Sequence, residues 1–328
     1  MARGETERIR QLKQQLRLRL SSDLALPGEP FFSSRQLARD FKIAYQTAHR
    51  VLAALEREGL IRRQQGKPTV VAGPPLQYRS VALVFAERAQ RPHSFGARLL
   101  ALLTDQLDKE GIQTQVIDSG RIPDLPPGRY PVFWEVPVDK PALLTLNRHA
   151  LFLNEKPVFG LATRLVDSLI LDDFAGGMAA GELLAEVFRC HRVAALGGPP
   201  LDPRSQNRID GLLRLFPKAR VMHAGTWEAA VPDTVLKRMV RHRPDGLFCV
   251  NDRLAARVKA HYQCHDDTPP AIVGFDDAPI AQLERISTIA IPWQGFVAEA
   301  VSIIRNRLQG SYASGQHRMV ACQAVLRG

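Results

Sequence analysis

The spacing of apolar residues changes along the chain. In residues 7–60 they recur every three or four positions, which is the period of an α-helix. Beyond residue 80 they come in short continuous runs separated by amphipathic stretches, which is typical of strands that are buried on both faces and alternate with helices. The pattern predicts a helical N-terminal unit followed by a larger α/β unit with parallel sheets.

Two helices are expected before residue 42. The first covers ERIRQLKQQLRLRL and ends at the breaker LPGEP. Ser33, with Gln36 three residues later, has the form of a capping box and predicts the start of the second. The apolar residues expected to bury one face of these helices are Ile9, Leu12, Leu16, Leu20, Leu37 and Phe41.

A third helix is expected over residues 44–58, followed by a basic β-hairpin. Gly59 and Leu60 have the form of a left-handed stop with an apolar clamp, and RRQQGKPTVV supplies turn residues followed by β-branched residues. The residues expected in its buried face are Ala48, Val51, Leu52 and Leu55. Three helices and a hairpin in this order predict a winged helix-turn-helix.

In such a unit the third helix enters the major groove of DNA with its N-terminal residues. The outward polar residues of this helix are Tyr45, Gln46, Thr47, His49 and Arg50. Gln46 and Thr47 are expected to reach base edges, whereas Arg35 in the second helix and Lys67 in the wing are placed to hold phosphates. The polar face of an ordinary amphipathic helix is the alternative, but the order of helices, turn, glycine stop and basic wing favours DNA binding.

The distribution of charge agrees with this expectation. Residues 1–73 carry 14 Lys and Arg against 7 Asp and Glu, whereas residues 74–328 carry 30 against 26. The basic excess therefore lies in the N-terminal unit, where it suits a polyanion.

Residues 24–71 resemble the DNA-binding domain of the GntR family of bacterial transcription regulators. The shared run is LPGE, Ser-x-x-x-Leu-Ala, a turn, the third helix, EGLI-R and the wing. This sequence departs from the family pattern at four positions, where family members commonly have serine, arginine, arginine and glycine: Ala44, Tyr45, His49 and Pro68. Fewer guanidiniums on the third helix imply a target sequence unlike the usual operators and more dependence on Arg50, Arg62, Arg63 and Lys67.

The segment AGPPLQYR marks the domain boundary. We expect a DNA-binding domain over residues 1–73, a linker over 74–79 and an α/β domain over 80–328. Its expected strands are SVALVF, TQVID, YPVFWEV, PVFGLA, SLILD, RVAALGG, ARVMHAG, GLFCVND and AIVGFD, and its expected helices cover 95–109, 141–153, 177–188, 207–216 and 233–241. The length allows two doubly wound lobes, in which ligands lie at the carboxyl ends of strands.

Polar residues follow three of these strands. Arg208 comes after RVAALGG, Asn251 ends GLFCVN, and Asp276 ends AIVGFD. Each of them could serve only as a helix cap or a core residue, but together they offer donors and acceptors for a hydroxyl-rich small molecule. Trp227 could stack on an apolar ring face, with a core tryptophan as the alternative.

These residues also resemble the effector-binding domain of LacI/GalR repressors and periplasmic sugar-binding proteins. The matching blocks are SLILDDFAGGMAAGELL, RSQNRIDGLLRLF, DGLFCVNDRLAARV, AIVGFDDAPIAQLE and STIAIPW. The resemblance implies two lobes joined by crossovers near 163–167, 290–293 and 311–317, with a helix over 295–309 returning to the first lobe. It places Arg208, Asn251 and Asp276 on effector hydroxyls and Trp227 on an aromatic that stacks on the ligand. The first lobe matches less well, because DSGRIPDLPPGRYP has prolines where a helix is usual and Ile291 replaces a common glutamine.

The sequence gives no support for catalysis. LGGPP is neither a dinucleotide nor a P-loop motif, there is no G-x-S-x-G, and no lysine has the context of pyridoxal phosphate, so we expect no enzyme and no cofactor. His261, Cys264 and His265 fit a solvated helix end better than a metal site, and the four scattered cysteines indicate reduced thiols. No apolar run approaches the roughly 20 residues that span a bilayer, and the charged N-terminus does not resemble a signal peptide.

Together these features predict a cytoplasmic homodimeric transcription regulator, with repression implied by the family resemblance. Its partners would be an operator in double-stranded DNA and a sugar or related effector bound between two lobes. Two alternatives stay open, namely a large domain that is a ligand-free dimerisation scaffold and an enzyme tethered to DNA.

Overall fold

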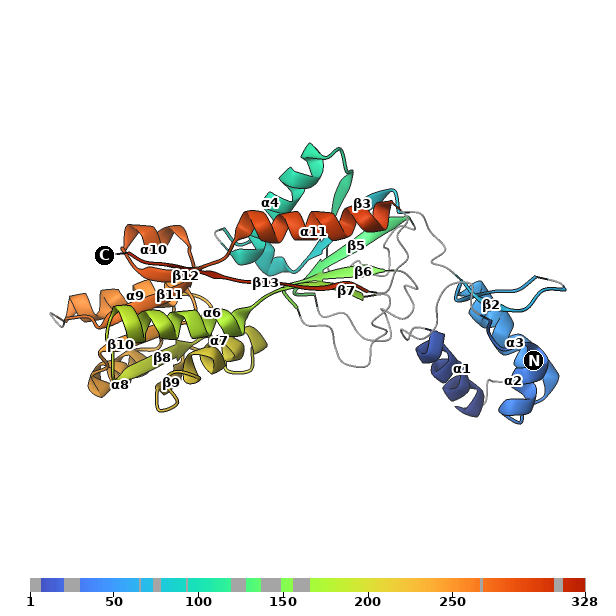
Figure 1. Cartoon of the computed structure of the whole chain (residues 1–328), viewed down its shortest axis with the longest axis horizontal. Helices are drawn as coiled ribbons and strands as arrows, with labels where there is room; N and C mark the ends of the chain where they lie inside the picture. The colour runs from blue at the N-terminus through green and yellow to red at the C-terminus, as the bar shows by residue number, and fades with distance from the viewer. Residues whose placement is uncertain are drawn as a thin grey trace. The chain divides into compact units, whose positions relative to one another are not determined.

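The computed structural model describes residues 7–20, 30–64, 66–72, 78–92, 94–118, 128–136, 149–155, 166–265, 268–309 and 315–327 (Figure 1). Two compact units are present: Met1–Ile170 with Val297–Arg318, and Leu171–Phe296 with Met319–Gly328. We call the second unit the C-lobe, and residues 78–170 with 297–318 of the first unit the N-lobe. The chain crosses at 170/171, 296/297 and 318/319, a few residues after each crossover expected from the sequence. Most of the expected linker 74–79, and parts of the crossovers 163–167 and 311–317, lie outside the described residues.

The N-terminal unit has the predicted winged-helix elements. They are α1 (Glu7–Leu20), α2 (Ser34–Asp40), α3 (Tyr45–Arg57), β1 (Ile61–Arg62) and β2 (Val70–Val71). The two strands pair antiparallel, with Ile61 opposite Val71. Leu16, Leu37 and Leu52 lie fully inside a single core made by the three helices and the wing. All the residues expected in the buried faces contribute to this core, although Ile9 and Phe41 are only partly buried.

Local signals explain where these helices begin and end. Ser33 Oγ accepts from the Gln36 amide at 3.2 Å and Gln36 Oε1 accepts from the Ser33 amide at 2.9 Å, which confirms the capping box. Gly59 has φ 70°, a left-handed conformation that glycine adopts without strain, and Leu60 beside it is buried. Arg17 clamps α1 to the end of α3 through two hydrogen bonds, of 2.8 and 2.6 Å, to the Glu58 carboxylate.

The N-lobe contains one six-stranded sheet of order β13-β7-β6-β5-β3-β4. Its strands are β3 (Ser80–Phe85), β4 (Thr114–Asp118), β5 (Arg129–Trp134), β6 (Ala150–Leu153), β7 (Val166–Leu171) and β13 (His317–Val320). Strands β4, β3, β5, β6 and β7 pair parallel, as the continuous apolar runs predicted. The helices of this lobe include α4 (Phe95–Lys109) and α11 (Trp293–Leu308), which begins in the C-lobe.

One prediction in the N-lobe is wrong. PALLTLNRHALFL was expected to be a helix, but Ala150–Leu153 form strand β6 between β5 and β7. All four of these residues are buried, and a short apolar run has the same appearance in a buried helix and in a buried strand. The preceding residues 141–148 of this segment, and PVFGLA after it, lie outside the described residues.

The C-lobe has a second six-stranded sheet, of order β14-β12-β11-β10-β8-β9. Its strands are β8 (Val193–Gly197), β9 (Arg220–His223), β10 (Gly246–Cys249), β11 (Ala271–Asp276), β12 (Ser287–Ala290) and β14 (Gln323–Val325). Its helices are α6 (Asp173–Glu182), α7 (Pro203–Leu213), α8 (Asp233–His242), α9 (Asp252–Cys264) and α10 (Pro279–Leu283). Helix α7 begins at Pro203 rather than at Asn207, because Asp202 caps it and Pro203 occupies its first turn. Only β14 is antiparallel to its neighbour β12.

A buried carboxylate holds together the three N-lobe segments that lie next to the crossovers. Asp167 of β7 accepts two hydrogen bonds, of 2.8 and 2.7 Å, from the guanidinium of Arg307 on α11. It also accepts from the amide of Gln316, just before β13, at 2.7 Å and from the hydroxyl of Tyr130 on β5 at 2.5 Å. Asp167 and Arg307 are both 0% exposed. A charge buried in this way is stable only while its partner is present.

We therefore expect Asp167→Ala to lower the free energy of unfolding by about 3–5 kcal/mol, because it removes the carboxylate that accepts two hydrogen bonds from the buried Arg307 guanidinium. Urea denaturation of the full chain measures this change. Glu110→Ala, which removes the partner of exposed Arg305, serves as the control and should have a much smaller effect. Equal losses in the two variants would contradict the role assigned to Asp167.

Candidate functional site

The winged helix exposes the side chains expected to contact DNA. Six of the seven candidates are exposed: Arg35, Tyr45, Gln46, His49, Arg50 and Lys67. The seventh, Thr47, is half-buried. Four of the candidates on α3 form two adjacent rows at i, i+4 spacing, because Tyr45 lies one turn before His49 and Gln46 one turn before Arg50. The first two turns of α3 thus present a polar surface of the kind that reads base edges.

Tyr45 and His49, which depart from the family pattern, lie close together on this surface. Their ring centroids are 6.5 Å apart, and Tyr45 is 53% exposed.

Arg63, which was expected to compensate for the missing arginines, is less available to bind DNA than predicted. Its backbone amide donates to Glu56 and its guanidinium lies 3.8 Å from the same carboxylate. Arg50 and Arg62 are exposed cations on α3 and β1.

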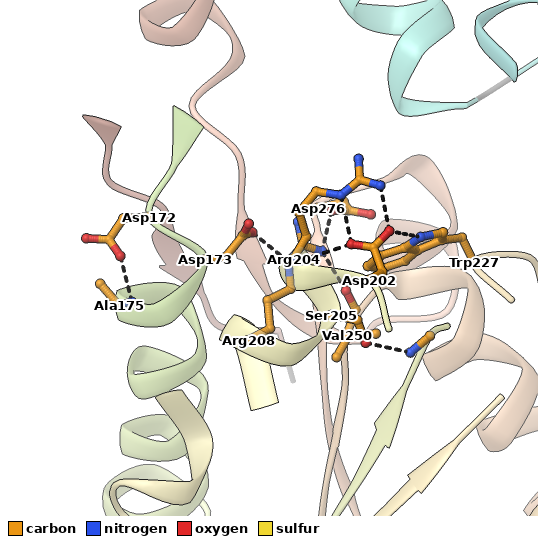
Figure 2. A network of polar contacts seen from close by, with 11 residues as sticks. Asp172, Asp173, Ala175, Asp202, Arg204, Ser205, Arg208, Trp227, Val250 and Asp276 are labelled. Atoms are coloured by element: carbon orange, nitrogen blue, oxygen red, sulfur yellow. Dashed lines mark hydrogen bonds and ion pairs between the residues drawn. The ribbon is translucent and has the colours of Figure 1, made fainter. Parts of the chain in front are cut away.

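In the C-lobe, helices α6 and α7 come unusually close, and this contact positions Arg208. A Cβ atom on Gly177 would lie 1.9 Å from the carbonyl oxygen of Arg208, and one on Gly211 would lie 2.1 Å from that of Phe174. Only glycine allows this backbone approach. The sequences FAGGM and RIDGLL therefore bring the start of α6 beside the middle of α7, where Asp173 meets Arg208 (Figure 2).

Arg208 is a buried guanidinium held from three directions. Its Nε donates to Asp173 Oδ1 at 2.8 Å, and its Nη1 donates to the Val250 carbonyl at 2.6 Å and to Asp276 Oδ1 at 3.1 Å. Its Cζ lies 3.6 Å from the centroid of the Phe275 ring. Burial lowers the pKa of Arg208, but Asp173 and Asp276 outweigh that effect and raise it. Among the described residues no hydrogen-bond partner is seen for its Nη2.

Asp276 combines an incomplete set of partners with an uncommon backbone conformation. Its side chain is 28% exposed, and within the described part of the chain only its Oδ1 has a hydrogen-bond partner. Its φ is 102°, and that of the next residue, Asp277, is 53°. A non-glycine residue with such a φ is strained, and strain of this kind is concentrated at functional sites. Burial raises the pKa of Asp276, and the Arg208 guanidinium opposes that shift.

Trp227 and Asn251 lie beside this cluster but use their polar groups internally. The Trp227 Nε1 donates to Asp202 Oδ2 at 3.0 Å. Asn251 accepts from the Leu254 amide at 2.8 Å, which caps α9, and donates to the Trp227 carbonyl at 2.7 Å. The structure therefore brings all four predicted effector residues into one lobe, and it gives Asn251 a helix-capping bond that the sequence analysis weighed only as an alternative.

The carboxylates Asp173, Asp202 and Asp252 belong to this region, and the sequence analysis did not assign them. NDRL has the form of a helix start, which was a local signal for Asp252. The helix after SLILD was expected only from residue 177, whereas α6 begins at Asp173, so the position of Asp173 at a helix start was not predicted. Asp252 is fully buried, with Oδ1 accepting from Thr288 and Oδ2 from the Ala278 amide, both at 2.7 Å. Burial raises the pKa of Asp252 to about 8, the Asp276 carboxylate adds to the increase, and the bonds from Thr288 and Ala278 oppose it.

The described residues contain no group of three or more His, Cys, Asp and Glu side chains that could hold a metal ion. His261 and His265 lie with ring centroids 4.4 Å apart at the end of α9. The two acidic residues that follow them in the sequence, Asp266 and Asp267, lie outside the described residues. Within the same part of the chain, no helix has the length and apolar character required to cross a membrane.

Comparison with known proteins relates the N-terminal domain to a known family and the whole chain to a known fold. Residues 8–71 match the model of the bacterial regulatory proteins of the gntR family. Among solved structures, the transcriptional regulator CelR in complex with cellobiose is 16% identical and has a TM-score of 0.65, covering 99% of this chain and 99% of CelR. No curated protein sequence matches the chain.

Two further structures resemble the larger part of the chain. A LacI family transcriptional regulator from Arthrobacter sp. FB24, in complex with lactose, is 19% identical with a TM-score of 0.64, covering 76% of this chain and 98% of that one. A periplasmic binding protein/LacI transcriptional regulator from Alkaliphilus metalliredigens QYMF, complexed with D-xylulofuranose, is 13% identical with a TM-score of 0.64 and covers the same shares. The chain thus combines a GntR-type N-terminal domain with a LacI-type, periplasmic-binding-protein-like fold, which confirms the predicted fold class and both resemblances.

The buried Asp252 gives a prediction about pH. Because the folded-state pKa is about 8 and an unfolded aspartate titrates near about 3.9, the folded chain holds a proton between these values that the unfolded chain releases. The stability contributed by this proton is complete below the pKa of the unfolded state. It is lost as the pH rises through the folded-state pKa of about 8. In Asp252→Asn the amide can accept from Ala278 and donate to Thr288 Oγ1 without titrating.

We therefore expect the unfolding free energy of the wild type, minus that of Asp252→Asn, to fall between pH 5 and pH 8. Urea denaturation at several pH values measures this difference. A difference that stays constant or rises over the range would show that Asp252 is ionised in the folded chain.

Proposed function

We propose that this protein is a transcription regulator that binds operator DNA through its winged helix and a small hydroxyl-rich effector, such as a sugar, between its two lobes. The observation that carries the proposal is the exposed polar surface of α3 within a GntR-type domain, joined in one chain to a LacI-type fold. The proteins of similar fold that were solved with cellobiose, lactose and D-xylulofuranose support a sugar as the class of effector.

On the DNA side, the roles follow from the chemistry of the exposed groups. Arg35 near the start of α2 and Lys67 in the wing would bind phosphates, and these contacts set position rather than sequence. Gln46 has both a donor and an acceptor that match the major-groove edge of adenine. Tyr45 and His49 would replace two guanidiniums, so sequence preference would shift away from guanine contacts.

On the effector side, Arg208 Nη2 and Asp276 Oδ2 form a donor and an acceptor that lack partners among the described residues. A sugar hydroxyl has one donor and two acceptor positions, and it can therefore satisfy both groups at once. The remaining bonds of Arg208, to Asp173 and to the Val250 carbonyl, would hold the guanidinium in place before the effector arrives.

Regulation would follow from dimer geometry. We propose a homodimer whose two winged helices read half-sites of fixed spacing, with repression as the direction. Effector binding would close the lobes and change the distance between the two DNA-reading heads. A scaffold without a ligand is the second candidate, and an enzyme tethered to DNA is the third.

Phosphate and base contacts should respond differently to substitution. Lys67→Ala should weaken binding about equally for all duplexes and reduce the slope of log K against log salt by about 1. Gln46→Ala should cost about 1–3 kcal/mol at particular base pairs only. Fluorescence anisotropy with a duplex selected from a random pool measures both effects, and Lys109→Ala on α4 of the N-lobe controls for loss of charge. A uniform effect of Gln46→Ala would disprove its role as a base reader.

Asp276→Asn tests the effector site while keeping the side-chain shape. The amide oxygen can still accept from Arg208 Nη1, but the second position becomes a donor and cannot accept from a sugar hydroxyl. We expect affinity to fall by about 10- to 100-fold, because a hydrogen bond to a charged group contributes about 1.5–3 kcal/mol. Calorimetric titration of cellobiose, lactose and D-ribose measures this, with Asp210→Asn on α7 as the control.

Two results would contradict the assigned effector site. A sugar that binds the wild type and Asp276→Asn equally would place the site elsewhere. Melting temperatures unchanged by a broad panel of metabolites would favour the scaffold, because a ligand that binds the folded state must stabilise it.

A further inference from the structure

Trp227 lies in the segment between β9 and α8, yet several contacts hold it in place. The guanidinium carbons of Arg204 and Arg208 lie 5.5 and 5.7 Å from the centroid of its ring. Its Nε1 donates to Asp202, its carbonyl accepts from Asn251, and its ring packs on Gly198. A Cβ atom on Gly198 would lie 3.2 Å from the indole ring, so the absence of a side chain there lets the ring approach the backbone. A loop side chain fixed at both its backbone and its ring edge has little freedom left to lose on binding.

Asp202 is one of the two residues whose side chains form hydrogen bonds with Trp227 (Figure 2). Its Oδ1 accepts from the amide and the Nε of Arg204, at 2.9 and 3.0 Å, and this caps α7. Its Oδ2 accepts from Arg204 Nη2 at 2.7 Å and from Trp227 Nε1 at 3.0 Å. Oδ1 therefore caps the helix, and Oδ2 accepts from both the Arg204 guanidinium and the indole of Trp227. Burial would raise the pKa of Asp202, but the Arg204 and Trp227 bonds lower it to about 2, so the carboxylate is charged at neutral pH.

The Asn251 side chain also has one polar atom that caps a helix and one that binds Trp227. Its Oδ1 caps α9 by accepting from the Leu254 amide, and its Nδ2 donates to the Trp227 carbonyl. Both ends of the amide are thus used within the C-lobe. Trp227 is only half-buried, whereas Trp134 and Trp293, the two other tryptophans of the chain, are 0% and 9% exposed.

We infer that Asp202 and Asn251 are positioning residues that fix Trp227 as a preformed stacking surface for the effector. This inference rests on the proposed function for the nature of the ligand. It also changes the role of Asn251, which acts on the effector through Trp227 and not by direct contact. An indole held in advance favours an effector with a flat apolar ring face, such as a pyranose, over a flexible acyclic polyol.

Two isosteric exchanges remove the bonds to Trp227 and keep the helix caps. In Asp202→Asn the amide oxygen still caps α7, but the amide nitrogen faces two donors, Trp227 Nε1 and Arg204 Nη2. In Asn251→Asp one oxygen still caps α9, while the other faces the Trp227 carbonyl and repels it. Asp172→Asn is the matched control, because Asp172 caps α6 through the Ala175 amide and forms no hydrogen bond with a tryptophan among the described residues.

The test is acrylamide quenching and fluorescence anisotropy of the full chain without any ligand. Both exchanges should raise the quenching constant of the accessible tryptophan and lower its anisotropy, whereas Asp172→Asn should leave both unchanged. The effects should disappear when Trp227→Phe is added, which assigns them to this residue. Unchanged quenching in both exchanges, or an equal change in Asp172→Asn, would overturn the positioning role.

Titration with cellobiose, lactose and D-ribose then separates this inference from the proposed function. A sugar that binds the wild type should lose about 10-fold in affinity in each exchange, which corresponds to about 1.4 kcal/mol. If that sugar binds both exchanges as it binds the wild type, Trp227 is not its stacking surface and the inference fails. If none of the three sugars binds the wild type, the result counts against the proposed sugar effector, and the quenching experiment alone decides whether Trp227 is positioned.

Discussion

A single buried guanidinium organises the C-lobe. Arg208 joins α6, α7, the end of β10 and the end of β11 through Asp173, the Val250 carbonyl and Asp276. An ion pair this far from water is costly unless its geometry is nearly complete, and here the close contact of glycines on α6 and α7 supplies that geometry. The same network leaves one donor and one acceptor without a partner among the described residues, so the element that stabilises the lobe also defines its candidate site.

The polar side chains at the strand ends have two kinds of role. Asn251 and Asp202 cap helices, which is the ordinary use of such residues, and they also restrain Trp227. Asp276 is different, because it has a strained backbone and a partly exposed carboxylate. A binding site built at helix starts is therefore positioned by the same hydrogen bonds that terminate the strands and begin the helices.

The sequence predicted local structure well and the polar network poorly. The capping box at Ser33, the stop at Gly59 and the boundaries of α4 depend on neighbouring residues, and the structure has all three. The strand Ala150–Leu153 was missed because a short apolar run does not distinguish a buried strand from a buried helix. Asp173 was missed as a partner of Arg208 because the pairing depends on how closely two helices approach, and that distance is not visible in a pattern of single residues. The use of both ends of the Asn251 amide was missed for the same reason.

The central claim is that one chain couples a small-molecule site to a DNA-reading surface. Thermodynamic linkage makes this coupling reciprocal, since DNA must change sugar affinity by the same factor by which the sugar changes DNA affinity. The most direct measurement is the affinity of the full chain for a bound sugar, with and without a saturating duplex selected for binding. The account predicts equal factors, different from one, in the two directions. A sugar affinity that is identical with and without the duplex would contradict it.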